Sequence, residues 1–203
     1  MLDYTIENQL HEEGFAVVCG IDEAGRGPLC GPVFAAACIL PDGLLLEGLN
    51  DSKKLTPKKR DKLFDLICEN AIAYCIASAS VEEIDELNIL EADLLAMRRA
   101  IDGLSVKADF ALIDGNIARG FQIPAKAIIG GDAKSPSIAA ASILAKVARD
   151  RDCITLDEQY PQYGIAKHKG YGTKQHMDAL RTYGPSPIHR KQFIRFLEKD
   201  ANK

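Results

Sequence analysis

The chain lacks the sequence features of membrane-spanning, secreted and zinc-binding proteins. No apolar run reaches the roughly 18 residues that a membrane-spanning helix requires. The first 14 residues are polar and acidic rather than signal-like, so we expect a cytoplasmic protein that does not contact a membrane. The six cysteines include no C-x-x-C pair, and no histidine lies at zinc-ligand spacing from a cysteine. Reduced, buried thiols are therefore the expected state.

The charge is distributed unevenly along the chain. The net charge of −4 hides a contrast between residues 1–159, with 16 Lys and Arg against 26 Asp and Glu, and residues 160–203, with 9 against 3. A basic segment of this kind is expected to face a polyanion, although a solvated basic helix surface is the alternative. The 203 residues predict one compact unit with a core, residues 1–159, and a basic helical extension, residues 160–203. Nothing in the sequence requires more than a monomer.

Hydrophobic periodicity predicts strands that alternate with helices. The expected strands are 15–22, 33–40, 71–80, 109–114 and 125–129, and the expected helices are 57–70, 81–102 with a break near Asn88, 137–156, 173–183 and 188–199. The first two strands are expected to pair as an antiparallel hairpin. Small residues along 139–145 would let the long helix pack close to a sheet. This order predicts an α/β fold with a mixed sheet covered on both faces.

Acidic residues mark the ends of three predicted strands. The first ends at Asp22 and Glu23, the fourth at Asp114, and the fifth is followed by Asp132. If these strands are neighbours, the carboxylates meet at one sheet edge, where they repel one another unless a cation is present. Mg²⁺ prefers such oxygen ligands. Two metals about 4 Å apart would activate a water and stabilise the leaving oxygen of a phosphodiester. Each acid taken alone is also a common turn residue.

The turn after the first predicted strand offers a phosphate or sugar contact. Glycines at 25 and 27 let a ligand approach the backbone, and Arg26 can pair with a phosphate. The alternative is a hairpin turn with a surface arginine. A dinucleotide fingerprint fits poorly, because the spacing departs from G-x-G-x-x-G and prolines follow.

Two lysine-rich segments are candidate contacts to a nucleic-acid backbone. The first, residues 51–60, places Lys53 and four other cations at a helix start. The second, residues 167–176, combines Lys169 and other lysines with Tyr171, an aromatic ring that can stack on a sugar or base. A solvated helix entry and a packed loop tyrosine are the alternatives.

Taken together, these segments resemble the ribonuclease HII family, the bacterial type 2 ribonuclease H. The likeness extends from Gly20 to about Phe193. It rests on ordered blocks: GIDEAGRGPLCGPV, LNDSKKLT, LIDGN, GGDAKSPSIAAASILAKVARDRD, YGIAKHKGYGTKQH and GPSPIHRKQF. Their order makes the match specific, although any single block could arise by chance.

The resemblance implies a ribonuclease H-like fold and an endoribonuclease that requires Mg²⁺ or Mn²⁺, with two ions in the active complex. The family hydrolyses RNA in RNA/DNA hybrids and incises 5′ of a single ribonucleotide in duplex DNA, leaving a 3′-hydroxyl and a 5′-phosphate. Its catalytic, metal-binding acids match Asp22, Glu23, Asp114 and Asp132. Its substrate contacts match Gly25, Arg26, Gly27, Lys53, Asn88 and Tyr171, to which the lysine-rich segment adds Lys169.

Three other functions remain possible from the residues alone. One is another ribonuclease H-like nuclease acting on DNA, such as a resolvase or integrase core, which the Gly-Arg-Gly turn disfavours. Another is a non-catalytic hybrid-binding module, for which a broken acid set is expected. A small-molecule phosphate enzyme would leave the basic extension without a role.

Overall fold

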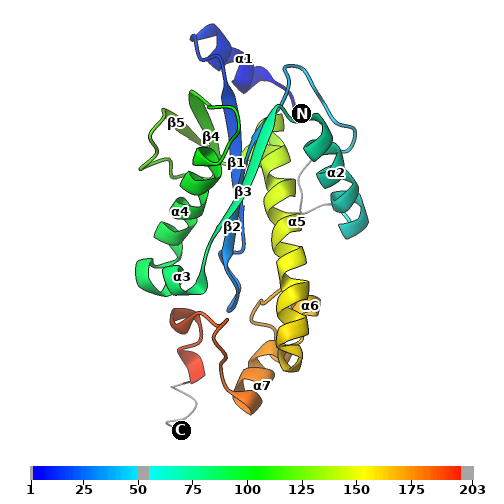
Figure 1. The fold of residues 1–203 in the computed structure, drawn as a ribbon, viewed down its shortest axis with the longest axis vertical. Helices are drawn as coiled ribbons and strands as arrows, with labels where there is room; N and C mark the ends of the chain where they lie inside the picture. Colours follow the sequence, from blue (N-terminus) through cyan, green and yellow to red (C-terminus); the bar gives the residue numbers. More distant parts are fainter. Residues whose placement is uncertain (1, 50–54, 198–203) are drawn as a thin grey trace.

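The computed structural model describes residues 2–49 and 55–197, and its core is a five-stranded mixed sheet (Figure 1). The strand order is β3-β2-β1-β4-β5. The strands are β1 (Val18–Ala24), β2 (Val33–Ile39), β3 (Ala73–Ala79), β4 (Phe110–Asp114) and β5 (Ala125–Ile128). β1–β2 and β2–β3 are antiparallel, whereas β1–β4 and β4–β5 are parallel. The predicted hairpin and the predicted mixed sheet are both confirmed.

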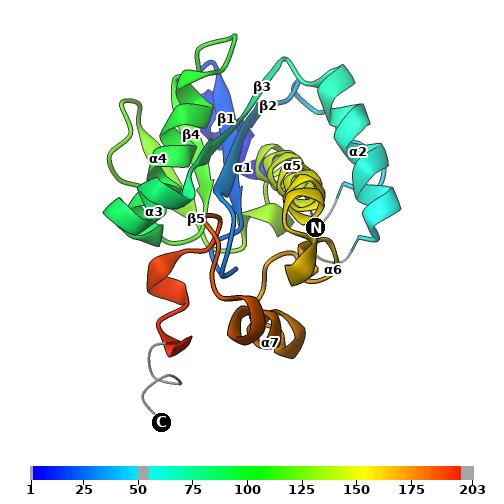
Figure 2. The ribbon, with the colours of Figure 1, turned by 60° about the horizontal axis from the view of Figure 1, so that its bottom comes forward.

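Helices cover both faces of this sheet, as the sequence predicts. The helices are α1 (Thr5–Glu12), α2 (Pro57–Asn70), α3 (Val81–Leu87), α4 (Ile89–Asp102), α5 (Pro136–Gln159), α6 (Ile165–His168) and α7 (Lys174–Tyr183). α4 lies on one side of the sheet, and α5 lies on the other with α2 outside it (Figures 1 and 2). No helix within residues 2–49 and 55–197 is long and apolar enough to cross a membrane.

Local capping fixes where several helices begin. Thr56 accepts a hydrogen bond from the Lys59 N–H and Pro57 occupies the first turn, so α2 begins where the sequence places it. Ser80 forms a capping box at α3. Asn88, with φ of 76°, ends α3 and caps α4, which is the predicted break.

The two faces of β1 and β2 bury different residues. Cys19 and Ile21 pack with α4, whereas Ala36 and Cys38 pack against the small residues of α5. Gly20 permits the close approach of α5: a Cβ there would lie 2.1 Å from the Ser137 carbonyl carbon. The predicted close packing of the small-residue helix face is confirmed. All six cysteines are free thiols.

Two predicted elements were wrong in extent or type. The first strand runs to Ala24 rather than ending at Asp22, because Glu23 and Ala24 still pair with β2. The helix predicted at 188–199 does not begin at 188: residue 188 lies in a turn, residues 189 and 190 are a β-bridge and extended backbone, and Lys191–Phe193 make a single 3₁₀ turn, with helical backbone only at 196 and 197 among the described residues. Pairing explains this, because His189 forms a β-bridge with Cys30.

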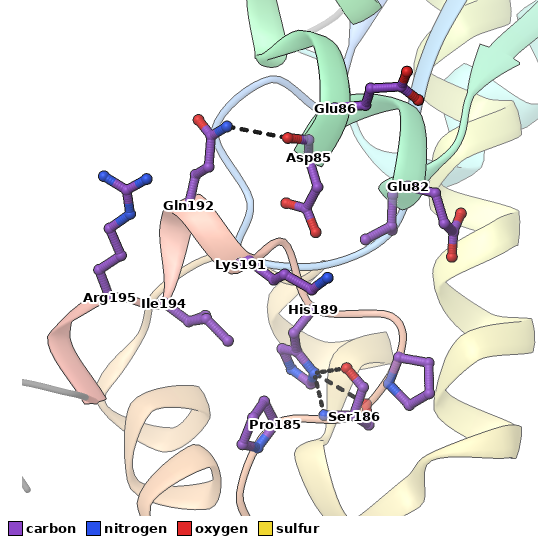
Figure 3. Close-up of a pocket in the computed structure, with 12 residues that line it drawn as sticks. Glu82, Asp85, Glu86, Pro185, Ser186, His189, Lys191, Gln192, Ile194 and Arg195 are labelled. Carbon is purple, nitrogen blue, oxygen red and sulfur yellow. Dashed lines mark hydrogen bonds between the residues drawn. The ribbon is translucent and has the colours of Figure 1, made fainter.

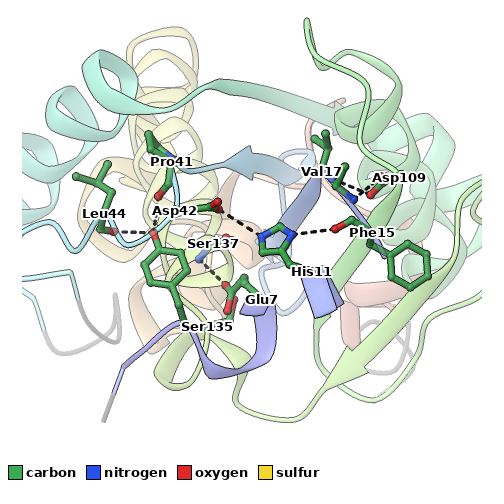
Figure 4. A network of polar contacts seen from close by, with 12 residues as sticks. Glu7, His11, Phe15, Val17, Pro41, Asp42, Leu44, Asp109, Ser135 and Ser137 are labelled. Atoms are coloured by element: carbon green, nitrogen blue, oxygen red, sulfur yellow. Dashed lines mark hydrogen bonds and ion pairs between the residues drawn. The ribbon is translucent and has the colours of Figure 1, made fainter. Parts of the chain in front are cut away.

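A polar network ties α1 to the start of α5 (Figure 4). The buried Glu7 carboxylate accepts hydrogen bonds from Ser135 Oγ at 2.6 Å and from the Ser137 N–H at 3.3 Å. Ser135 Oγ in turn accepts the Ile138 N–H, which caps α5. This network anchors the segment that immediately follows Asp132.

Candidate active site

Two of the predicted acids lie side by side near the C-terminal ends of neighbouring parallel strands. The β1–β4 register pairs Ile21 with Ile113, so Asp22 and Asp114 are the next residues of both strands, at the same sheet edge. Because side chains alternate along a strand, Asp22 shares the α5 face with Gly20, and it interacts with Ser142 of α5. Glu23 points to the opposite face, toward α4. The predicted strands are therefore neighbours and bring Asp22 and Asp114 together, although β1 continues two residues beyond Asp22.

The fourth acid is brought to this edge by a turn after β5. Asp132 is buried in a short 3₁₀ helix, Gly131–Ala133, which follows Gly130 in the left-handed conformation. The Gly131 N–H donates to Asp114 Oδ1 at 2.6 Å. This bond links the backbone beside Asp132 directly to the Asp114 carboxylate.

Burial and mutual repulsion perturb two of these carboxyls. The pKa of Asp22 is raised well above its usual value, mainly by burial and then by the charges of Glu23 and Asp114. The pKa of Glu23 is also raised, mainly by burial and also by Asp114, although the Arg26 guanidinium opposes this shift. The ionised forms of both carboxyls are therefore disfavoured at this end of the sheet in the absence of a bound cation.

A fifth acid, Asp93, lies in the same site and was not predicted. Asp93 is 2% exposed and belongs to α4. It pairs with Arg26 at 3.5 Å, and burial together with Glu23 raises its pKa to about 8. The sequence signal was present but weak: an aspartate stands among apolar residues on the inward face of a helix.

Asp93 and two of the predicted acids line one small cavity. Its volume is about 50 Å³. The other lining residues are Arg26, Leu90, Leu94, Met97, Gly115, Asn116 and Ile117, in addition to Glu23, Asp93 and Asp114. Carboxylate oxygens from β1, β4 and α4 thus border a single space large enough for a small ligand or ion.

The Gly-Arg-Gly turn lies beside the acids and against Tyr171. Gly25 has φ of +103°, a conformation that favours glycine. Arg26 pairs with Glu23 at 3.7 Å. A Cβ at Gly27 would lie 3.4 Å from the Tyr171 ring, which is 48% exposed. The structure therefore brings together the two predicted sugar contacts, which are far apart in the sequence.

The remaining predicted substrate contacts are Lys169, Asn88 and Lys53. The Lys169 carbonyl accepts a hydrogen bond from Arg149 at 2.6 Å, and this lysine adopts a left-handed backbone beside Tyr171. Asn88 is exposed, and its side-chain oxygen caps α4. Lys53 lies outside the described residues.

A cluster of residues of the types that bind metals lies away from the acids, and the spacing of these residues in the sequence does not reveal it. Within the described residues, ligand atoms of Cys30, His176 and His189 lie within 4.8 Å of one another. The Tyr171 carbonyl accepts from His176 Nδ1, and the Ser186 N–H donates to His189 Nδ1, so His189 Nε2 donates to His176 Nε2 at 3.1 Å. Burial, the larger cause, and His176 lower the pKa of His189 to about 4. The imidazoles form a neutral hydrogen-bonded pair in the core of the extension.

A larger cavity of about 750 Å³ separates α3 from the C-terminal segment (Figure 3). Glu82, Asp85 and Glu86 line the α3 side, whereas Lys191 and Arg195 line the other side. None of the predicted site residues that the structure describes lines this cavity, so its size does not mark the candidate active site.

Comparison with solved structures defines the class of protein. The sheet order, the flanking helices and the C-terminal helices are those of a ribonuclease H-like α/β protein. The ribonuclease H2 from Pyrococcus horikoshii OT3 superposes with a TM-score of 0.76 at 29% identity, covering 93% of this chain and 100% of that one. A ribonuclease HIII, solved in complex with Mn²⁺, shares the fold with a TM-score of 0.69 at 18% identity, covering 93% of this chain and 66% of that chain.

Sequence comparison then gives the family. The profile described as Ribonuclease HII matches residues 19–196. Ribonuclease HII of Desulfitobacterium hafniense (strain DSM 10664 / DCB-2) is 59% identical over 187 residues, which is 92% of this chain and 72% of that protein. The Burkholderia thailandensis protein of the same name is 58% identical over 177 residues, which is 87% of this chain and 83% of that protein. The chain belongs to the ribonuclease HII family and is an endonuclease.

Proposed function

We propose that this enzyme hydrolyses the RNA strand of RNA/DNA hybrids and incises 5′ of single ribonucleotides in duplex DNA, leaving a 3′-hydroxyl and a 5′-phosphate. The observation that carries the proposal is the acidic sheet edge beside the Gly-Arg-Gly turn. In this proposal Asp22, Glu23, Asp114 and Asp132 hold Mg²⁺ or Mn²⁺. Two such ions, when bound, supply an activated water and stabilise the leaving oxygen.

The chemistry of the acidic edge fits a divalent cation. Carboxylates are the hard oxygen ligands that Mg²⁺ and Mn²⁺ prefer. Burial and repulsion raise the pKa values of Asp22 and Glu23, so their ionised forms are costly until positive charge is added. Arg26 offsets only part of this charge. A bound cation would favour the ionised carboxylates that coordinate it.

The chain's own groups orient the substrate in this proposal. The main chain of the Gly25–Gly27 turn contacts the ribose 2′-hydroxyl, which is the group that distinguishes RNA from DNA. Tyr171, half exposed beside Gly27, packs on the neighbouring sugar. A backbone contact is indifferent to the base, so recognition depends on sugar and shape rather than sequence.

The basic C-terminal extension and the lysines contact the phosphates. Residues 160–203 carry an excess of 6 positive charges, from 9 basic and 3 acidic residues, and the described part of this segment packs near the β1–β2 turn (Figure 2). We propose that three residues contact the sugar-phosphate backbone of the nucleic acid and so position the duplex: Lys53, Asn88 and Lys169. We further propose a monomer that works in the cytoplasm, which its six free thiols support.

The decisive assay compares two duplexes that differ at one sugar. A DNA duplex with one internal ribonucleotide should be nicked 5′ of that nucleotide in Mg²⁺ or Mn²⁺, whereas the all-DNA duplex should remain intact. Equal cutting of both would favour a DNA nuclease of the resolvase or integrase kind. No metal-dependent cutting of either would favour a hybrid-binding module.

A matched variant separates catalysis from binding. Asp114→Asn keeps the shape of the side chain and an oxygen that can accept the Gly131 N–H, but removes the charge. We expect cleavage to fall at least about a thousandfold, or about 4 kcal/mol of transition-state stabilisation. Folding and duplex binding should be retained, and calorimetry should show weakened Mg²⁺ binding. Retained cleavage by this variant would remove Asp114 from the proposed site.

A further inference from the structure

Arg190 is an unusual residue in the C-terminal segment because its charged side chain is completely buried, at 0% exposure. Within residues 2–49 and 55–197, the hydrogen bonds of its side chain all go to main-chain carbonyl oxygens of the turn between β1 and β2. Nε donates to Gly31, Nη1 to Arg26 and Pro28, and Nη2 to Gly25 and Pro32, at 2.9, 3.1, 2.9, 2.7 and 3.2 Å respectively. A guanidinium has five N–H donors, and here there are five acceptors.

The carbonyl dipoles replace the water that a buried cation loses. Burial, with a smaller contribution from the Arg149 charge, lowers the pKa of Arg190 to about 10, so this side chain is still charged at neutral pH. A lysine presents three donors from a single point and cannot match a planar arrangement of five carbonyls. The turn is therefore built around an arginine specifically.

This arrangement also sets the direction of the peptide N–H groups. In a trans peptide the C=O and the following N–H point in opposite directions, and none of the described peptide bonds is cis. Because Arg190 binds the carbonyls of Gly25 and Arg26, the N–H groups of Arg26 and Gly27 point away from the guanidinium. Neither N–H donates to a main-chain carbonyl within residues 2–49 and 55–197.

The same segment links this turn to Tyr171. The Leu29 N–H donates to the Gly170 carbonyl at 2.8 Å, and the Arg190 N–H donates to the Leu29 carbonyl at 2.9 Å. Arg149 donates to the Lys169 carbonyl, and its guanidinium lies 5.8 Å from the centre of the Tyr171 ring. The turn and the aromatic ring are thus held by one network.

We propose that Arg190 is a positioning residue for ribose recognition: it holds the carbonyls of the 25–32 turn inward and so presents the N–H groups of Arg26 and Gly27 to the 2′-hydroxyl. Arg190 itself does not touch the substrate. The inference rests on the proposed function, in which this turn reads the sugar.

The test measures binding preference rather than turnover. In an Asp114→Asn background, which removes cleavage, a dissociation constant is measured for a DNA duplex with one ribonucleotide and for the same duplex with deoxyribose throughout. The ratio of the two constants is the readout. Partial unfolding lowers the active fraction equally for both duplexes, so it leaves the ratio unchanged.

Arg190→Lys should lower the preference for the ribonucleotide by about fivefold, the equivalent of one hydrogen bond, while affinity for the all-DNA duplex stays within about twofold. Phe193→Leu is the milder second variant, because that ring lies 5.3 Å from the guanidinium but accepts none of its five hydrogen bonds. It should give a smaller fall in the ratio. Leu63→Ala is the matched control: it destabilises α2 in a separate apolar cluster and should leave the ratio unaltered.

The outcomes distinguish a failure of the role proposed for Arg190 from a failure of the proposed function. If the Asp114→Asn protein binds the ribonucleotide-containing duplex more tightly than the all-DNA duplex, an unchanged ratio in both Arg190→Lys and Phe193→Leu would overturn the role of Arg190 and leave the proposed function intact. If the Asp114→Asn protein binds both duplexes equally, ribose recognition by the turn is overturned, and the role of Arg190 with it. If Arg190→Lys does not fold, the Phe193→Leu ratio decides: a fall supports the proposal, and no change overturns it.

Discussion

Gly20→Ala is expected to separate the sheet from its central helix. An added Cβ would lie 2.1 Å from the Ser137 carbonyl carbon, 2.2 Å from the Ile138 nitrogen and 2.4 Å from the Ser137 oxygen. These are all backbone atoms, so no side-chain rotation can relieve the contact. Reaching an ordinary contact of 3.4 Å from 2.1 Å requires β1 and α5 to move apart by 1.3 Å.

The cost of this movement follows from the packing of the interior. Overpacking typically costs about 1–3 kcal/mol, and a backbone clash between two core elements belongs at or above the upper end of that range. We expect the free energy of unfolding to fall by about 3 kcal/mol. For a chain of this length the melting temperature should then fall by roughly 6–12 °C. Without the clash, Gly→Ala would stabilise the protein by about 0.4–1 kcal/mol. A fall in the free energy of unfolding, rather than a rise, would therefore already indicate the clash.

Activity should fall with stability, because Asp22 interacts with Ser142 on the helix that is displaced. The assay is urea unfolding followed by circular dichroism, with Gly172→Ala as the control. At that position the added methyl would lie 3.4 Å from a Leu29 side-chain carbon, so a change of no more than about 0.5 kcal/mol is expected. A Gly20→Ala protein within 1 kcal/mol of the parent would refute the packing argument.

Three further predictions concern the site and the fold. Burial and Glu23 raise the pKa of Asp93 from 3.8 to about 8, so its protonation stabilises the fold at low pH, and that stability is lost as pH rises toward 8. Asp93→Asn should therefore flatten the fall in melting temperature between pH 5 and pH 9 in metal-free protein. Tyr171→Ala should spare Mg²⁺ binding by calorimetry but reduce turnover on a single-ribonucleotide duplex more than on a long hybrid. Thr56→Ala should cost about 0.5–1 kcal/mol in urea unfolding, because its hydroxyl caps α2 at 3.4 Å from the Lys59 nitrogen.

Each of these three predictions has an outcome that contradicts it. An unchanged pH dependence in Asp93→Asn would mean that this carboxyl ionises normally. Equal loss on both substrates in Tyr171→Ala would remove the special contact with the isolated ribonucleotide. An unaltered unfolding midpoint in Thr56→Ala would mean that solvent caps α2 equally well.

Local chemistry made much of the fold predictable. The Thr56–Pro57 signal gave the start of α2. The predicted break near Asn88 is confirmed, and its side chain caps α4 there. Residues 188–193 were wrongly predicted as part of a helix because the pairing of residues 188–190 with residues 29–31 is a long-range contact that periodicity does not record. Asp93 was missed for a related reason: its α4 sequence does not show that it faces Glu23.

The sequence alone determined that Asp22, Glu23 and Asp114 lie in or beside strands, and it showed the glycines of the following turn and the family blocks. All of these depend on residues that are near neighbours in the chain. Only the tertiary structure decided that Asp93 joins the site, that Tyr171 lies beside Gly27 and that Arg190 holds the turn. The physical reason is that burial and repulsion are properties of groups that meet in space. Residues far apart in the sequence share them only once the sheet and its helices have packed.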